Sequence, residues 1–483
     1  MSKSITTNYL FSLINTVSSV LFPLITFPYV TRILYADGIG LVQFYSSVIT
    51  YITLIVSVGI PSYAVRQIAR VRDNQEDLNK QTIEILLLHL YLTAIGYLLV
   101  FLISLTVGRI QENLPLFFLL STNIFFVTIG CEWFYQGIED FKYITIRAII
   151  VRTVCVVLLF MLVHDREDIL YYGFYSVFGV VGGNVFNFIR LRKYVSLSRV
   201  KLKSLNPWRH FLPAIKIFGL ILISSVYLNL DIVMLGFLSD NSSVGYYIGA
   251  EKLTKLLMGV VTAVGAVILP RLSNIAANDG MEEFKKIVNK SIQFVIAISL
   301  PLIVGLIVMS PILIQFFCGE GYYPSISCLI ILSPIVFLIS VSYIINQSFY
   351  PLNMMRELYI KAAISAGVNF FLNLLLIPAY KQDGAAIGTF VAELLSTVVS
   401  VYLFRNVIRI HFLTYRNILY LSSALLMGVV LISFKMMSLP NIINVFLLPV
   451  IGMIVYSSIL FYSKDEFSKE LFVKFKAIIN VKK

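Results

Sequence analysis

Long apolar runs separated by short polar segments dominate the chain. Each run reaches about 20 residues, the length that an α-helix needs to cross the hydrocarbon core of a bilayer. The pattern predicts about fourteen spanning helices, at residues 9–31, 39–59, 84–107, 114–137, 144–163, 168–189, 213–237, 243–268, 291–316, 323–349, 358–377, 384–404, 416–436 and 440–462. The first run is too long for a signal-peptide core and lacks a small-residue cleavage site, so we expect it to be retained as the first span.

The composition agrees with an all-α integral membrane protein. Of the 483 residues, 58% are hydrophobic and 13% are charged, which is about half the ~25% of charged residues usual in soluble domains. No His/Cys cluster has the spacing of a metal site, and no Gly-rich phosphate loop occurs. The four cysteines, at 131, 155, 318 and 328, are expected to be buried free thiols.

Basic residues alternate between the loops. Thirty of the 38 Lys and Arg, Arg147 and Lys361 among them, fall in one set of loops and the tail, and five fall in the other set. Because cytoplasmic loops carry the excess of Lys and Arg, this bias predicts that both ends lie in the cytoplasm. It also accounts for the net charge of +13 without nucleic acid, since membrane lipids attract basic loops. The outer loops are short, which favours a transporter over a membrane-embedded polymerase or glycosyltransferase.

The chain is predicted to consist of two related halves. Residues 36–44 read ADGIGLVQF and residues 240–247 read DNSSVGYY, so each half has an acidic turn, then an apolar–Gly pair and an aromatic residue. Two six-helix bundles related by a parallel repeat are therefore expected. The predicted parts are an N-terminal bundle at 1–189, a basic cytoplasmic linker at 190–212, a C-terminal bundle at 213–410, helices 13 and 14 at 411–463, and a basic tail at 464–483. We expect the linker to form a helix on the lipid surface.

Several segments together resemble one family. Residues 229–236 read NLDIVMLG, 132–141 read EWFYQGIEDF and 384–389 read GAAIGT, with Asn369 and Asn373 before the last of these and Glu393 after it. These segments resemble polysaccharide transporters, the Wzx-type O-antigen flippases of the multidrug/oligosaccharidyl-lipid/polysaccharide exporter superfamily. The resemblance covers the chain to about residue 410.

The resemblance implies a function and partners. Such proteins move undecaprenyl-diphosphate-linked oligosaccharide repeat units from the inner to the outer leaflet of the bacterial plasma (inner) membrane. They serve the assembly of O-antigen, capsule or other surface polysaccharides by alternating access, and are not enzymes. A polysaccharide polymerase and glycosyltransferases are the implied partners, with membrane lipids around the chain. The alternatives are a cation-coupled multidrug exporter of the same superfamily and a membrane-embedded polysaccharide polymerase.

Charges within the predicted spans are candidate site residues, because each costs at least ~2.5–3.5 kcal/mol to insert. Glu251, Lys252 and Lys255 lie in the eighth span, and Asp231 lies in the seventh at a comparable depth. The two lysines suit a net-positive wall that binds a diphosphate. In the alternative interpretation the charges neutralise one another, with Asp231 pairing with Lys252 and Glu251 with Lys255.

Three further charged regions are candidates. Glu132 and Arg152 lie in the inner parts of spans four and five, where they either serve the site or pair with each other; nearby Arg147 is expected to snorkel to the interface. Arg32, at the outer end of the first span, is either a release-side phosphate contact or an anchor. Glu393, near the middle of span twelve, is with Glu132 a candidate for coupling to H⁺ or Na⁺, or else a structural carboxyl. No other cofactor is expected.

The amides Gln43, Asn346 and Gln347 complete the set of candidate substrate contacts. Amide side chains suit the hydroxyl groups of sugars. They also form hydrogen bonds between transmembrane helices, so both roles stay open for them.

Overall fold

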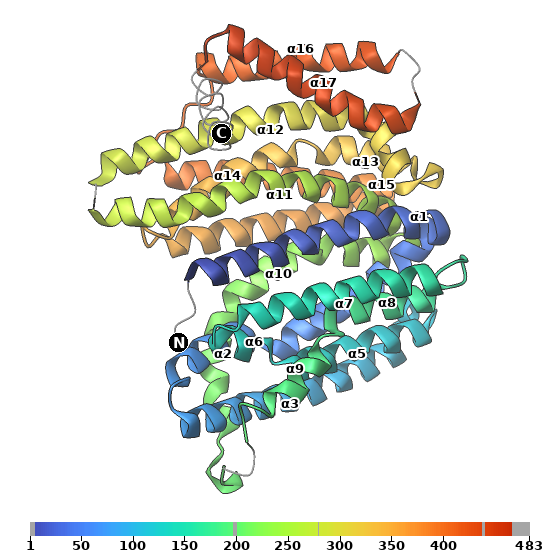
Figure 1. Cartoon of the computed structure of the whole chain (residues 1–483). Helices are drawn as coiled ribbons and strands as arrows, with labels where there is room; N and C mark the ends of the chain where they lie inside the picture. Colours follow the sequence, from blue (N-terminus) through green and yellow to red (C-terminus); the bar gives the residue numbers. More distant parts are fainter. Residues whose placement is uncertain (1–4, 197–199, 279, 437–439, 466–483) are drawn as a thin grey trace, which may run out of the picture. The chain divides into compact units, whose positions relative to one another are not determined.

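The computed structural model describes residues 5–196, 200–278, 280–436 and 440–465, and every regular element in these ranges is helical (Figure 1). The contacts divide the chain into two compact units, Met1–Gly245 and Tyr246–Lys483. The N-terminal unit holds α1 (Ile5–Ser57), α2 (Ile60–Val71), α3 (Gln75–Thr106), α4 (Gly108–Gln111), α5 (Leu114–Gly130), α6 (Glu132–Gly137), α7 (Phe141–Leu162), α8 (Ile169–Val181), α9 (Asn184–Leu191), the 3₁₀ helices η2 (Leu202–Ser204) and η3 (Pro207–His210), α10 (Phe211–Leu238) and the start of α11 (Asn241–Asn278). The C-terminal unit holds the rest of α11, then α12 (Gly280–Cys318), η4 (Glu320–Tyr322), α13 (Ser325–Leu332), α14 (Ile335–Phe349), α15 (Met355–Phe404), α16 (Tyr415–Lys435) and α17 (Asn441–Tyr462).

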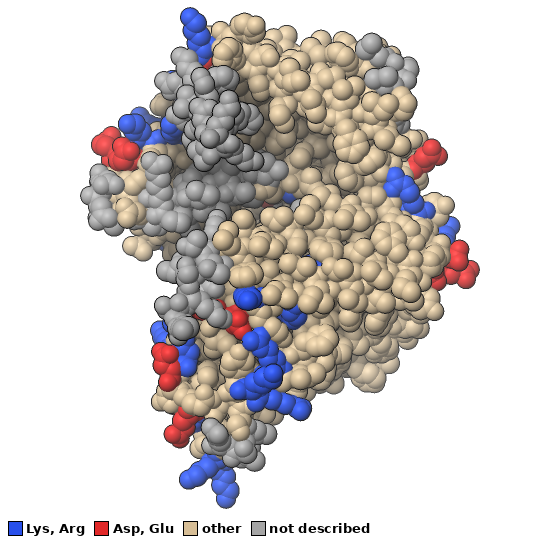
Figure 2. Space-filling model, in the orientation of Figure 1, with Lys and Arg blue, Asp and Glu red and all other residues tan. Residues whose placement is uncertain are grey.

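The chain is a multi-pass membrane protein. Among the described residues, ten helices are long and apolar enough to cross a membrane. Many large apolar side chains on them are exposed, such as Phe371 at 64% and Leu375 at 71%, as expected where lipid is the solvent. On the face drawn in Figure 2, most of the described surface belongs to residues other than Lys, Arg, Asp and Glu. The fourteen crossings and the cytoplasmic position of both ends stay predictions.

Two of these helices contain a break that the sequence pattern placed as a loop. In α1 the backbone leaves helical geometry at Tyr35, where φ is 55°, and in α15 it does so at Lys381, where φ is 50°. An unbroken helix of 53 residues would extend about 80 Å, far more than the ~30 Å hydrocarbon core. Each break instead leaves two helical segments of membrane-spanning length, in the places of the predicted spans 9–31 and 39–59, and 358–377 and 384–404.

The two related turns of the repeat lie against each other. A Cβ atom added to Gly40 would lie 1.8 Å from the Asn241 carbonyl oxygen, and one added to Gly245 would lie 2.0 Å from that of Ala36. Only glycine permits this approach of one backbone to another. Arg109 of α4 holds the same region, since its Nη2 donates to Asn241 Oδ1 at 2.8 Å.

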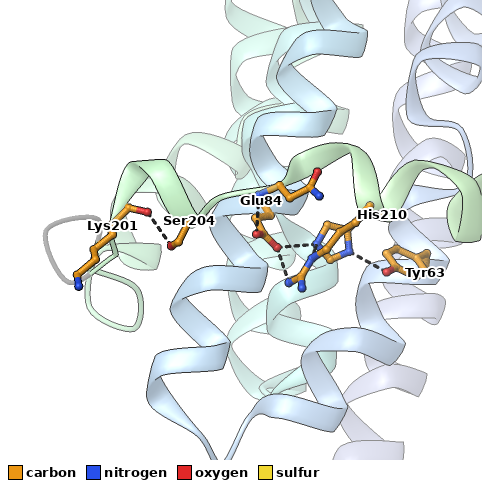
Figure 3. Close-up of polar contacts among 7 residues, drawn as sticks. Tyr63, Glu84, Lys201, Ser204 and His210 are labelled. Atoms are coloured by element: carbon orange, nitrogen blue, oxygen red, sulfur yellow. Dashed lines mark hydrogen bonds and ion pairs between the residues drawn. The ribbon is translucent and has the colours of Figure 1, made fainter.

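The linker is anchored to the N-terminal unit by a buried ion-pair cluster (Figure 3). Glu84 of α3 has a fully buried side chain, and its carboxylate accepts from Arg209 at 2.5 Å, from His210 Nε2 at 3.0 Å and from the backbone N–H of Asn206 at 2.8 Å. His210 Nδ1 in turn lies 2.7 Å from the hydroxyl of Tyr63 on α2. This cluster, called here the linker anchor, joins α2, α3 and η3 directly before α10 begins.

The hydrogen bonds of the linker anchor indicate the protonation state of His210. An ionised carboxylate only accepts hydrogen bonds, so His210 Nε2 donates to Glu84, and in the neutral ring Nδ1 accepts from Tyr63. Burial lowers the pKa of His210, and although the bond to Glu84 opposes this effect, the net direction is downward. The neutral ring is therefore the favoured form at neutral pH.

The prediction of a surface helix for the linker is wrong in its described part. After α9 the chain forms turns and the short helices η2 and η3 instead of one continuous helix. Pro207 and the tertiary contacts of the linker anchor explain this, because they hold the backbone where a straight surface helix would not reach Glu84. Residues 197–199 of the linker and residues 466–483 of the predicted basic tail lie outside the described residues, and the predicted part boundaries stay predictions.

Candidate functional site

A pocket of about 100 Å³ within the N-terminal unit gathers three charged side chains. It is lined by α1, α6, α7 and the α8–α9 region, with the residues Asn15, Glu132, Ile144, Arg147, Ala148, Val151, Arg152, Gly179, Val180 and Gly183. The five lining residues on α7 follow the spacing i, i+3, i+4, i+7 and i+8, so one face of this helix forms a wall of the pocket. This region is called here the arginine pocket.

Arg147 is the more buried partner of the ion pair in the arginine pocket. Its side chain is 10% exposed, and its Nη2 forms an ion pair with Glu132 Oε2 at 2.9 Å. Its Nε and Nη1 are buried and have no hydrogen-bond partner among the described residues. A guanidinium carries five donors, so Arg147 keeps donors for an additional oxygen-rich group.

Gly183 makes room for this arginine. A Cβ atom at residue 183 would lie 2.8 Å from Arg147 Nε and 2.9 Å from its Cδ. The backbone at Gly183 has φ −75°, which any residue can adopt. The glycine therefore serves space and not backbone conformation, since any side chain here would force the Arg147 side chain to shift.

Arg152 is held by α1. Its Nη1 donates to the side-chain oxygen of Asn15 at 2.9 Å, to the carbonyl oxygen of Asn15 at 3.1 Å, and to the hydroxyl of Ser18. All the hydrogen bonds that Arg152 forms within the described part of the chain leave from this one nitrogen. The fixed Nη1 therefore positions the rest of the guanidinium at the pocket wall.

Glu132 is placed by a break between α5 and α6. Cys131 takes the left-handed conformation with φ 43°, so a new helix begins with Glu132. Of the two alternatives for Glu132, a direct ion pair with Arg152 is not formed: the carboxylate binds Arg147, accepts from Gln136 at 3.4 Å, and interacts with Arg152 only electrostatically. The expectation that Arg147 snorkels to the interface is also wrong, since its side chain is only 10% exposed and forms its ion pair with Glu132.

In the C-terminal unit, the charges of α11 partly neutralise one another. Lys255 Nζ lies 2.7 Å from Glu251 Oε1, which confirms the predicted pairing of these two residues. Lys252 is half-buried on the same helix, near enough to Glu251, Cys318 and Lys255 for electrostatic interaction. Lys252 and Lys255 are thus neighbours on α11, and Glu251 lies next to both.

A second polar cluster in this unit is built around Lys361, which the charge count assigned to a cytoplasmic loop. Its Nζ donates to Ser342 Oγ at 2.8 Å and to Asn346 Oδ1 at 3.0 Å. Glu393, 6% exposed, is near enough to interact electrostatically with this ammonium. Of the predicted residues, Asn346 and Glu393 thus share Lys361 as a partner, while Gln347 has a buried oxygen with no partner among the described residues.

The other predicted residues lie apart from these groups. Arg32 is exposed and donates to the carbonyl oxygen of Pro28 one turn earlier. Asp231 is 7% exposed and interacts electrostatically with Tyr51, and Gln43 is half-buried on α1. All four cysteines are buried thiols outside any disulfide, as predicted. Within the described residues, no group of three or more His, Cys, Asp or Glu could hold a metal ion.

Comparison with known families identifies the chain. The family described as "Polysaccharide biosynthesis protein" matches residues 5–276, more than half of the length. The chain belongs to this family. A putative O-antigen transporter of Escherichia coli K12 is 26% identical to this chain over 394 residues, which cover 80% of this chain and 94% of the relative. A probable low-salt glycan biosynthesis flippase of Haloferax volcanii is 28% identical over 232 residues, covering 48% of this chain and 49% of the relative.

Solved structures show the fold of this family member. A lipid II flippase, MurJ, in an inward closed conformation aligns with a TM-score of 0.75 at 17% identity, covering 94% of this chain and 99% of the other. An inward-facing multidrug resistance transporter of the MATE family aligns with a TM-score of 0.62 at 13% identity, covering 77% of this chain and 92% of the other. The helical transporter fold predicted from the motifs is confirmed.

Proposed function

We propose that the chain is a flippase of the bacterial plasma membrane that moves undecaprenyl-diphosphate-linked oligosaccharide from the inner to the outer leaflet, for O-antigen, capsule or another surface polysaccharide. It acts as a transporter by alternating access and not as a catalyst. The relatives named as O-antigen transporter and glycan flippase support this class of cargo. A polysaccharide polymerase and glycosyltransferases are the proposed partners in the same assembly.

The arginine pocket carries the proposal. Arg147 and Arg152 are two permanently charged guanidinium groups on one face of α7. Guanidinium groups bind phosphate oxygens through directed pairs of hydrogen bonds. The buried donors of Arg147 that lack a partner among the described residues suit a ligand with several acceptor oxygens, as a diphosphate has. In this proposal the diphosphate lies at Arg147 and Arg152 and the polyprenyl chain stays in lipid.

The candidates of the C-terminal unit are proposed as contacts in their own right. Lys252 and Lys255 on α11 suit an anionic head group, and amides such as Asn346 and Gln347 suit sugar hydroxyls. Coupling to H⁺ or Na⁺ is proposed at Glu393, whose buried carboxylate interacts with Lys361.

A cation-coupled multidrug exporter is the second candidate, because the fold of the MATE transporters is also similar. Cationic drugs need an acidic or apolar site. The arginine pocket has two arginines and one glutamate, so its net positive charge favours an anionic cargo.

The test is complementation in a bacterium that lacks its own flippase for a surface glycan and makes the matching lipid-linked glycan. Leaflet-selective labelling measures glycan that reaches the outer leaflet. We expect the wild-type chain to restore it, and Arg147→Gln, Arg152→Gln and the Lys252→Ala/Lys255→Ala double variant to lower it at least tenfold at matched membrane levels. Gly183→Ala should act like Arg147→Gln, because the added methyl displaces the Arg147 side chain.

Arg72→Gln is the matched control. Arg72 lies in the same unit but forms its ion pair with Glu139 at 2.7 Å on the surface, away from the pocket lining. We expect it to leave export unchanged. Normal export by Arg147→Gln and Arg152→Gln would show that the arginine pocket does not bind the cargo, and drug efflux without glycan export would favour the exporter.

A further inference from the structure

The ion pair inside the arginine pocket uses the same chemistry that a phosphate ligand would use. A carboxylate and a phosphate both accept charge-assisted hydrogen bonds from a guanidinium. Glu132 satisfies only Nη2 of Arg147, at 2.9 Å, and its own side chain is 44% exposed while that of Arg147 is 10% exposed. The anion of the pair is thus the accessible partner and the cation is the buried one.

We propose that Glu132 is a displaceable counter-ion of Arg147 that excludes singly charged phospholipid head groups from the arginine pocket and yields to a diphosphate. This inference rests on the proposed function and assigns Glu132 as a specificity-determining residue. A transporter with a cationic pocket in a bilayer meets anionic phospholipids in large excess over its cargo. A site selective against them needs a repulsive element as well as an attractive one.

The charges of the pocket support this selection. Arg147, Arg152 and Glu132 together give the lining one net positive charge. A phosphodiester head group has one negative charge, the same as Glu132, so it gains little by replacing a carboxylate that is already in place. A sugar-linked diphosphate has two negative charges and more acceptor oxygens, so it can bind Arg147 and Arg152 together.

The unsatisfied hydrogen-bond donors of Arg147 favour replacement of Glu132 by a diphosphate. Arg147 Nε and Nη1 are buried without a partner among the described residues, and each unsatisfied buried donor is costly. A diphosphate that draws the guanidinium toward the pocket supplies acceptors for these donors. Released Glu132 keeps its hydrogen bond with Gln136 at 3.4 Å and its access to solvent, so exchange does not bury an unpaired carboxylate.

Binding to the purified full-length chain tests the inference. Undecaprenyl diphosphate and phosphatidylglycerol are titrated separately and in competition, with native mass spectrometry as the readout. For Glu132→Gln we expect phosphatidylglycerol to bind about tenfold more tightly, and the preference for the diphosphate to shrink by a similar factor. Glu132→Asp, which keeps the charge but shortens its reach to Arg147, should lie between Glu132→Gln and the wild type.

Glu139→Gln is the matched control, since it makes the same charge change in an exposed ion pair of the same unit. It should leave both affinities unchanged. In an Arg147→Gln background the effect of Glu132→Gln should be smaller, because the ion pair is already lost and only the charge of Glu132 near Arg152 remains. Unchanged phosphatidylglycerol binding in both Glu132 variants would overturn the inference while the proposed function stands. Failure of the wild-type chain to bind the diphosphate would instead count against the proposed function.

Discussion

The linker anchor offers the sharpest prediction about stability. Glu84→Gln keeps the size of the side chain and one oxygen for the Asn206 N–H. It replaces the other oxygen, which accepts from Arg209 and His210, with an amide that donates. A buried donor would then face two donors. The expected result is a less stable N-terminal unit with a weaker linker attachment.

The magnitude follows from the burial of each partner. Leaving a buried donor without its acceptor costs about 1–3 kcal/mol, and more where the lost partner was charged. Glu84 is fully buried and the His210 side chain is 4% exposed, but that of Arg209 is 42% exposed and can turn to water. We therefore expect Glu84→Gln to lower the free energy of unfolding by about 2–4 kcal/mol, chiefly through His210.

Thermal unfolding in detergent measures this effect. The chain has two tryptophans, and Trp208 lies beside the linker anchor, stacked on Tyr91 with ring centroids 6.3 Å apart. In a Trp133→Phe background, fluorescence reports on Trp208 alone. Glu139→Gln serves as the control, because exposed ion pairs contribute about 0–1 kcal/mol. If Glu84→Gln loses no more stability than this control, the linker anchor does not hold the linker.

Three further predictions concern other buried contacts. Because the pKa of His210 is lowered in the folded chain, the histidine of the unfolded state takes up a proton at higher pH than that of the folded state. The free energy of unfolding therefore falls as the pH drops below about 6.5. His210→Gln should reduce this pH dependence between about pH 7 and 5. Gly40→Ala must separate the two repeat turns and lower the unfolding midpoint, unlike Gly305→Ala, where nothing lies within 4 Å of the added atom. Lys361→Met should destabilise the C-terminal unit, and Glu393→Gln in the same chain should restore part of the loss in a double-mutant cycle.

The positions of the helices could be predicted because apolar length is a strong signal in a membrane protein. The predicted span 144–163 became α7, and the predicted span 416–436 became α16, with ends that differ by at most three residues. The breaks were predicted only in part. Tyr35 and Lys381 lie in predicted loops, whereas Cys131 lies inside the predicted span 114–137. All three take positive φ values, a conformation that sequence patterns assign to glycine or asparagine, so the residues at these positions did not indicate it.

The candidate site was partly predictable. Glu132 and Arg152 were selected because charges inside apolar runs need a cavity or a partner, and both line the arginine pocket. The choice of partner was not predictable, because it depends on how α6 is turned by the break at Cys131. The helical spacing of the lining residues on α7 was present in the sequence, and Arg147 lies on that face.

Arg147 and Lys361 show that counting loop charges predicts the orientation of the chain but not the position of each basic side chain. Each lies six residues after the start of its helix, Phe141 for α7 and Met355 for α15, a depth from which a long cation can either snorkel outward or turn inward. Both turn inward, since an acceptor lies within reach: Glu132 for Arg147, and Ser342 with Asn346 for Lys361. The direction of such a cation thus depends on polar groups that lie near it only in the fold. Moving both out of the loop count leaves 28 basic residues against five, so the predicted orientation does not depend on them, whereas the positive charge of the pocket depends directly on Arg147.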